Sequence, residues 1–178
     1  MKQLLTSAVL LCCLSTTSFA QMSTFKAGTV ITEFGKYADV PSSTVGIDSS
    51  FKVAFDAVRA ADDGKVNRKF DSLARFINMH VAAGVKKENI SLALVVHGKA
   101  IFDLMNNDAY KDKKGTENAN IPLLEALMEN NVRVILCGQS AAANAVELKH
   151  LVEGVEIELS AMTAHALLQQ QGYTSNPF

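Results

Sequence analysis

The sequence has no long apolar run and no concentration of charge of one sign. Its apolar runs stay below the roughly 18 residues that suggest a membrane-spanning helix. Basic and acidic residues, 17 and 18 in number, are mixed along the chain and give a formal net charge of −1. Proteins that bind nucleic acid typically carry a basic patch or stripe, and none is present. We therefore expect neither a membrane span nor a nucleic-acid partner.

The signatures of common cofactors and metals are missing too. No GxGxxG motif occurs, and Gly98-Lys99 lacks the earlier glycine and the following Ser or Thr of a phosphate loop. No spacing resembles a zinc signature, and three histidines fall on predicted helices away from the strand ends. These are His80, His150 and His165. We expect no cofactor and no metal, although a metal shared by Cys137 and His97 of neighbouring subunits is a weaker alternative.

Cysteine is scarce, and two of the three cysteines lie in the first twenty residues. Those residues have the order of a secretory signal: Lys2, then an apolar run, then the small residues of Ser18-Phe19-Ala20 at a cleavage site. Cleavage after Ala20 would leave Cys137 as the only thiol, so no internal disulfide could form. We expect an exported, periplasmic protein, in which a lone thiol is either buried or used.

The remaining chain has the length of one domain. We predict an export signal at residues 1–20, an extended N-terminal arm at 21–47 and an α/β domain at 48–178. Residues 90–96 form a nearly continuous apolar run, which is typical of a central parallel strand covered on both faces. Residues 155–159 alternate apolar and acidic side chains, which indicates a strand nearer an edge.

Strands and helices alternate along the predicted domain. The patterns predict strands at 51–56, 90–96, 132–136 and 155–159, helices at 70–81, 99–106, 120–130, 139–149 and 160–171, and a polar loop at 107–118. This alternation predicts a single-domain, three-layer α/β/α fold with a mostly parallel sheet, as in flavodoxin-like folds.

Three predicted strands end in side chains that could carry chemistry. These are Asp56, His97 and Cys137. In open parallel sheets, ligands bind outside the carboxyl ends of the strands, so we expect the three side chains at one edge. Each also has a simpler interpretation: an aspartate in an ordinary turn, a histidine that satisfies a backbone group, and a buried thiol.

Cys137 stands directly before a predicted helix, whose first N–H groups and dipole favour an anion such as a thiolate. Gly138 allows close backbone approach to the site, or serves only a tight turn. The candidate catalytic residues are Cys137 and His97. The candidate ligand-binding residues are Asp56, Gly98, Gly138, Gln139 and Ser140.

Four separated motifs resemble the DsrE/DsrF-like family, and in particular its exported branch. They are Val95-Val96-His97-Gly98-Lys99-Ala100, residues 118–124, Leu136-Cys137-Gly138-Gln139-Ser140, and Leu159-Ser160-Ala161-Met162 followed by residues 168–173. The resemblance covers about residues 50–174. It implies a DsrE-like topology, assembly into homo-oligomers of three or six subunits, and a place among sulfur-relay proteins, in which the cysteine matching Cys137 accepts sulfur as a persulfide.

Two main functions stay open at this point. In the first, the chain is a sulfur carrier, with possible sulfurtransferase-like activity, that holds a persulfide on Cys137 with help from His97; its sulfur donor and acceptor are unknown. In the second, it is a non-catalytic oligomeric module that binds a small ligand or anion while Cys137 is merely buried. Relay proteins of the family that this chain resembles work in the cytoplasm, whereas we expect this chain to be exported.

Overall fold

The computed structural model describes residues 25–176, and the predicted export signal at residues 1–20 lies outside this range. The strands are β1 (Phe51–Ala57), β2 (Ile90–Val96), β3 (Arg133–Cys137), β4 (Glu156–Glu158) and β5 (Thr174–Asn176). The α-helices are α1 (Arg68–Ala82), α2 (Asn107–Lys114), α3 (Ile121–Glu129), α4 (Gly138–Ala143) and α5 (Ala161–Gln170). Short 3-10 helices are η1 (Lys87–Asn89), η2 (Gly98–Leu104) and η3 (Leu148–His150).

The strands form one sheet in the order β4-β3-β2-β1-β5, and every neighbouring pair is parallel. The predicted α/β class is therefore confirmed. β2 is central and mostly buried, as its continuous apolar run predicts, and β4 lies at one edge. β5 at the other edge was not predicted, because its three residues are polar and carry no apolar pattern.

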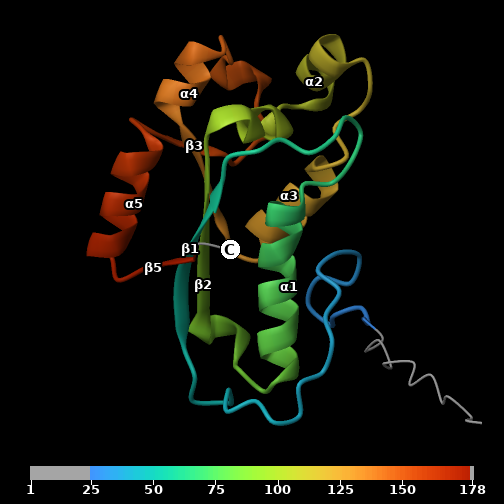
Figure 1. The fold of residues 1–178 in the computed structure, drawn as a ribbon, viewed down its shortest axis with the longest axis vertical. Helices are drawn as coiled ribbons and strands as arrows, with labels where there is room; N and C mark the ends of the chain where they lie inside the picture. The colour runs from blue at the N-terminus through green and yellow to red at the C-terminus, as the bar shows by residue number, and fades with distance from the viewer. Residues whose placement is uncertain (1–24, 177–178) are drawn as a thin grey trace, which may run out of the picture.

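Helices cover both faces of the sheet (Figure 1). α1 and α3 pack on one face and bury the larger apolar cluster, whereas α5 covers the other face over a much smaller one. The helical side chains of the larger cluster include Phe70, Leu73, Ile77, Leu123, Leu124 and Leu127. The smaller cluster consists of Ala54, Ala93, Val95, Ile135, Ala164 and Leu168.

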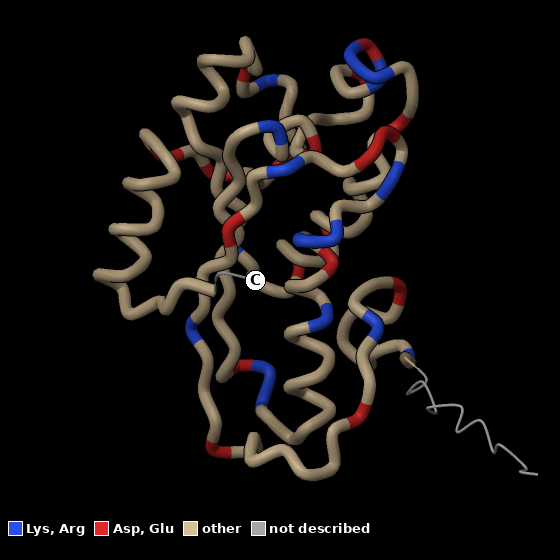
Figure 2. The backbone as a smooth tube through the Cα atoms, viewed as in Figure 1, with Lys and Arg blue, Asp and Glu red and all other residues tan. Residues whose placement is uncertain are grey.

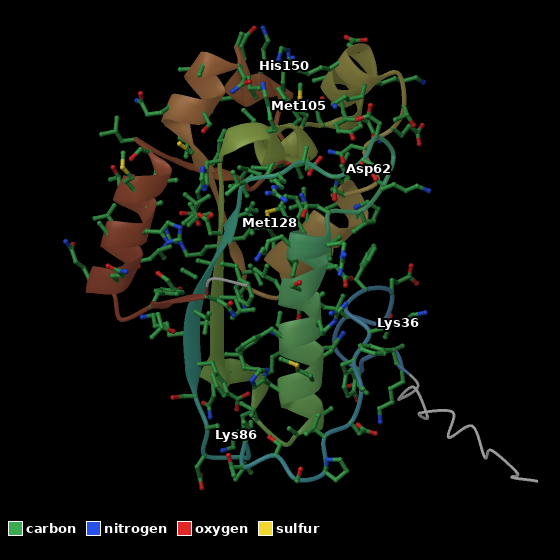
Figure 3. All side chains as sticks on the ribbon, viewed as in Figure 1. Lys36, Asp62, Lys86, Met105, Met128 and His150 are labelled. Atoms are coloured by element: carbon green, nitrogen blue, oxygen red, sulfur yellow. The ribbon has the colours of Figure 1, made fainter. Side chains whose placement is uncertain are left out.

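α1 forms where the spacing of apolar residues predicts a helix. The side chain of Asn67 accepts a hydrogen bond from the backbone N–H of Lys69 and so caps its first turn. Apolar residues at three- and four-residue spacings from Phe70 to Ile77 all face the core. In Figure 3, side chains fill the space between the sheet and this helix layer, and Met128 of α3 lies there.

Two predictions about local structure are wrong. The expected polar loop at 107–118 contains α2, because Asn106 caps its start and Gly115 ends it in a left-handed conformation, two local signals that outweigh its lack of an apolar stripe. The helix expected at 139–149 ends at Ala143. Asn144 turns its side chain back to the carbonyl of Ser140, and the next residue has a positive φ of 52°, which a continuing helix does not allow.

The N-terminal segment from residue 25 packs on α1 without joining the sheet. Lys26 and Tyr37 form an isolated antiparallel bridge, and Ile31 is buried in the larger cluster. Asn78 of α1, only 1% exposed, accepts from the N–H of Ile31 and donates to its carbonyl at 3.0 and 2.8 Å. These bonds fix the segment against the helix.

The positions of charged residues along the described backbone do not form a stripe of one sign (Figure 2). Lysines alternate with acidic residues even in α2, where Asp108 and Asp112 lie among Lys111, Lys113 and Lys114. Within residues 25–176, no helix is both long enough and apolar enough to cross a bilayer.

Candidate functional site

The strand-end residues singled out from the sequence project from one face of the sheet. They are Asp56 of β1, His97 directly after β2, and Cys137 at the end of β3. The residues two positions earlier in each strand are Ala54, Val95 and Ile135, which belong to the cluster under α5. Side chains two positions apart in a strand share a face. All three candidates therefore emerge on the α5 side, at the carboxyl edge.

Strand register places His97 beside Cys137. Val96 and Leu136 are partners in the parallel β2–β3 pair, so the next residues along the two chains leave the sheet as neighbours. On its other side, the N–H of His97 donates to the carbonyl of Ala57 at 2.9 Å. His97 is therefore held between the ends of β1 and β3.

Cys137 occupies the N-cap position of α4. Its Sγ accepts a hydrogen bond from the backbone N–H of Ser140 at 3.4 Å, as a capping side chain does. The residue is only 5% exposed. The thiol is thus largely covered by its neighbours.

The surroundings of Cys137 favour the thiolate. Burial raises the pKa of the thiol, but the hydroxyl and the N–H group of Ser140 lower it. The N–H groups of Ala161 and Gln139 act in the same direction, and the net pKa lies below its ordinary value. Because Ala161 is the first residue of α5, the sulfur lies where two helices begin, and both present backbone donors to it.

Two glycines make this arrangement sterically possible. A Cβ on Gly138 would lie 2.9 Å from the carbonyl oxygen of Glu158 and 3.3 Å from that of Leu159, so only glycine lets α4 start this close to the β4–α5 connection. Gly98 has a φ of +56°, and a Cβ there would lie 2.8 Å from the carbonyl oxygen of Val58. Both glycines of the sequence prediction are therefore required by backbone packing.

The segment after His97 is tied to the helix after Cys137. The N–H of Gly98 donates to Oγ of Ser140 at 3.0 Å, and Nζ of Lys99 donates to Oδ1 of Asn144 at 2.8 Å. The hydroxyl of Ser140 thus accepts a hydrogen bond from Gly98 and also favours the thiolate form of Cys137. Gln139 contributes its N–H group, and its side chain is exposed.

Asp56 binds two imidazoles. Nε2 of His97 lies 3.1 and 3.0 Å from its two carboxylate oxygens, and Nε2 of His165 lies 2.9 Å from Oδ1. Burial raises the pKa of Asp56, but the hydrogen bonds from His165 and His97 outweigh it, so the pKa lies below its ordinary value. The carboxylate is therefore ionised and orients both rings through their Nε2–H groups.

His165 is the residue that the sequence prediction missed, because its helix was expected to lie away from the strand ends. α5 packs over the face of the sheet from which Asp56 projects, and His165 of α5 forms a hydrogen bond to the Asp56 carboxylate. The sequence signal that could have placed His165 toward the sheet is its position next to Ala164 and three residues before Leu168, both of which face the sheet. His80 and His150 lie elsewhere: His80 stacks on Phe76 of α1, and His150 ends η3.

A cavity of about 980 Å³ opens next to Asp56. It is lined by the β1–α1 connection and the first half of α1, including Arg59, Arg68 and Lys69. No group of His, Cys, Asp or Glu side chains within residues 25–176 has an arrangement suited to a metal ion. The interactions at Asp56 are those of a hydrogen-bonded cluster.

Residues 52–175 match the model of the DsrE/DsrF-like family, and the chain belongs to that family. The structure is similar to that of a protein of unknown function, MTH1491 from Methanobacterium thermoautotrophicum, with a TM-score of 0.53 and 15% identity over 71% of this chain and 98% of that one. It is also similar to the YchN protein from E. coli, with a TM-score of 0.51 and 22% identity over 70% and 96% of the two chains. These two likenesses concern the fold. No curated protein sequence gives a significant match.

Proposed function

We propose that this protein is a sulfur carrier that holds a persulfide on Cys137. The observation that carries the proposal is the position of Sγ at the starts of α4 and α5, where N–H groups lower the pKa of the thiol. A thiolate is the nucleophile in sulfur transfer, and the same donors would stabilise the anionic terminal sulfur of a persulfide. Membership of a family that includes sulfur-relay proteins supports this function.

The transfer step conserves oxidation state overall. The thiolate of Cys137 attacks the outer sulfur of a donor R–S–SH, a new S–S bond forms at Sγ, and the S–S bond of the donor breaks. The electron pair of the broken bond leaves with RS⁻, which takes up a proton. The protein keeps one sulfane sulfur, ready for an acceptor thiolate to attack in the same way.

The test of this function is direct loading. The purified protein is incubated with glutathione persulfide, and its intact mass is followed. We expect a gain of one sulfur atom that cyanide or a thiol reductant removes, and no gain in Cys137→Ser. Absence of labile sulfur on the wild-type protein, while an alkylating reagent still reaches Cys137, would refute the carrier function.

A second function remains in competition because Cys137 is only 5% exposed. In that alternative, the carboxyl edge binds a small ligand or anion in the cavity beside Asp56, and Cys137 serves only to cap α4. Labelling of Cys137 that is slow in the native protein and fast after denaturation would favour this module. Labelling that is fast in the native protein would exclude it.

We further propose that the carrier works outside the cytoplasm, in the periplasm, and that it is a homo-oligomer of three or six subunits. The order of charged, apolar and small residues at 1–20 supports export. Large apolar side chains exposed near the β4–α5 connection support assembly; these are Ile157, Leu159 and Met162. Cell fractionation with and without residues 1–20, and light scattering of the purified protein, test the two statements.

A further inference from the structure

We propose that Asp56, His97 and His165 form a proton relay for Cys137, in which His97 carries the proton and His165 acts through Asp56 as a positioning residue. The inference rests on the proposed carrier function and assigns roles to three side chains at the same edge. Its starting point is one carboxylate shared by two imidazoles, with nitrogen–oxygen distances between 2.9 and 3.1 Å.

The carboxylate fixes which nitrogen of His97 is available for chemistry. Nε2 of His97 faces Asp56, whose lowered pKa keeps it an acceptor, so the ring carries its hydrogen on Nε2. Nδ1 then presents a lone pair, and it has no hydrogen-bond partner among the described residues. The side chain of His97 is 29% exposed, so a substrate at the edge can reach it.

His165 completes the orientation of Asp56. Its Nε2–H donates to Oδ1, while its Nδ1 is buried without a partner. A proton on that buried nitrogen would be a donor with no acceptor, which favours the tautomer with hydrogen on Nε2. His165 therefore supplies a fixed donor that holds the carboxylate in place beneath α5, and it does not touch the reacting sulfur.

The position of His97 suits proton transfer to a group that leaves during attack by Cys137. Register makes it the neighbour of Cys137, both side chains emerge on the α5 face, and the Gly98–Ser140 hydrogen bond holds the two segments together. In the reaction, the Cys137 thiolate attacks the outer sulfur of R–S–SH, and His97, protonated at Nδ1, gives that proton to the departing RS⁻. Asp56 stabilises the imidazolium that exists before this transfer.

A relay of this kind matters only when the leaving group needs a proton. A thiolate leaving from an organic persulfide is basic and gains from general acid catalysis, whereas iodide leaving from iodoacetamide does not. Sulfite leaving from thiosulfate is much less basic than a thiolate. The relay therefore predicts that its loss slows loading from glutathione persulfide, spares loading from thiosulfate and leaves alkylation nearly unchanged.

The experiment measures single-turnover loading of Cys137 from both donors, and its alkylation by iodoacetamide, as functions of pH. His97→Gln keeps an N–H donor for Asp56 but has no proton-accepting nitrogen. We expect it to slow loading from glutathione persulfide by about 10²-fold and to remove the part of the pH profile that depends on His97, while the part set by ionisation of Cys137 remains. Its alkylation should stay within about twofold of the wild type.

Two variants of one residue test the positioning role. His165→Ala should slow loading from the persulfide by about tenfold, whereas His165→Gln, which offers an amide N–H to Asp56, should restore most of the rate. His150→Gln is the matched control, because His150 lies at the far end of η3 beside the Met105 segment (Figure 3). Its loading should equal that of the wild type.

Three results would overturn the relay. One is equal slowing of loading and alkylation in His97→Gln, which would mean a structural effect on the thiol. Another is equal slowing with both donors. The third is a His165→Ala rate equal to that of the wild type. Failure of the wild-type protein to load from either donor would instead refute the carrier function itself.

Discussion

The face of the sheet under α1 and α3 differs from the face under α5 in size and in chemistry. The first buries most of the apolar side chains of the domain, and none of its strand residues is ionisable. The second has a cluster of six small or medium side chains, and beyond it, at the carboxyl edge, come a carboxylate, two imidazoles and a thiol. Apolar burial on the α1–α3 face stabilises the fold, and this stability compensates for the polar groups held at the edge of the α5 face.

The largest expected effect is on chemistry, at the α5 face. Cys137→Ser should lose all capacity to hold labile sulfur, because a hydroxyl at this position forms no persulfide. The hydroxyl keeps a capping oxygen for the N–H of Ser140, so the free energy of unfolding should change by less than about 1 kcal/mol. Mass spectrometry and urea denaturation check the two statements, and a large loss of stability would show that the thiol is mainly structural.

Leucine truncations on the two faces form the next comparison. Leu124 is fully buried in the larger cluster, whereas Leu168 belongs to the smaller cluster on α5. Both alanine variants should lower the free energy of unfolding by about 2–5 kcal/mol, and Leu124→Ala should lower it more than Leu168→Ala. Leu168 is one turn from His165, so Leu168→Ala should also slow sulfur loading, which Leu124→Ala should not do under native conditions. Equal effects of both variants on loading would remove the distinction between the faces.

A smaller effect is expected where the two helix starts approach. Gly138→Ala places a Cβ 2.9 Å from the carbonyl oxygen of Glu158, and backbone rather than a flexible side chain must move. We expect a cost of about 1–3 kcal/mol and a higher pKa of Cys137, because the N–H group of Ala161 moves away from Sγ. Gly172→Ala is the control for adding a methyl group without a clash, because no atom lies within 4 Å of a Cβ at this position. Its positive φ adds some local backbone strain.

The smallest effect is on the pH dependence of stability. The pKa of Asp56 is lowered in the folded state, so its contribution is present above the unfolded value of about 3.9 and is lost as the pH falls through the folded pKa. Asp56→Asn should be less stable than the wild type near neutral pH, by less than about 1 kcal/mol because the side chain is one-third exposed. The difference should vanish in acid. Urea denaturation across this pH range measures it.

Asp103 offers the opposite slope as a control. It is fully buried, burial raises its pKa despite hydrogen bonds from Asn67 and Ala61, and one carboxylate oxygen has no partner. The stability linked to its protonated form is present below the unfolded pKa and is lost as the pH rises through the folded pKa. The stability of Asp103→Asn relative to the wild type should therefore increase as the pH rises, whereas that of Asp56→Asn should decrease. The same pH response in both variants would contradict these opposite pKa shifts.

The sequence was sufficient for four of the five strands and for the edge at which chemistry is expected, but not for β5. Apolar runs defined β1 to β3, and the rule for open parallel sheets brought Asp56, His97 and Cys137 to one edge. His165 could not be found in the same way, because its place depends on how α5 is rotated over the sheet, which packing decides. α2 and the early end of α4 depend on caps and a single positive φ, which an alanine-rich or lysine-rich pattern conceals.

The central claim is that Cys137 is a stabilised thiolate which reagents can reach in the folded protein. The rate of its alkylation against pH, followed by intact mass with Cys137→Ser as the blank, tests this most directly. We predict a midpoint well below the unperturbed value of about 8.5. A midpoint at or above that value, or a thiol that reacts only after unfolding, would contradict the account and leave Cys137 as a cap of α4.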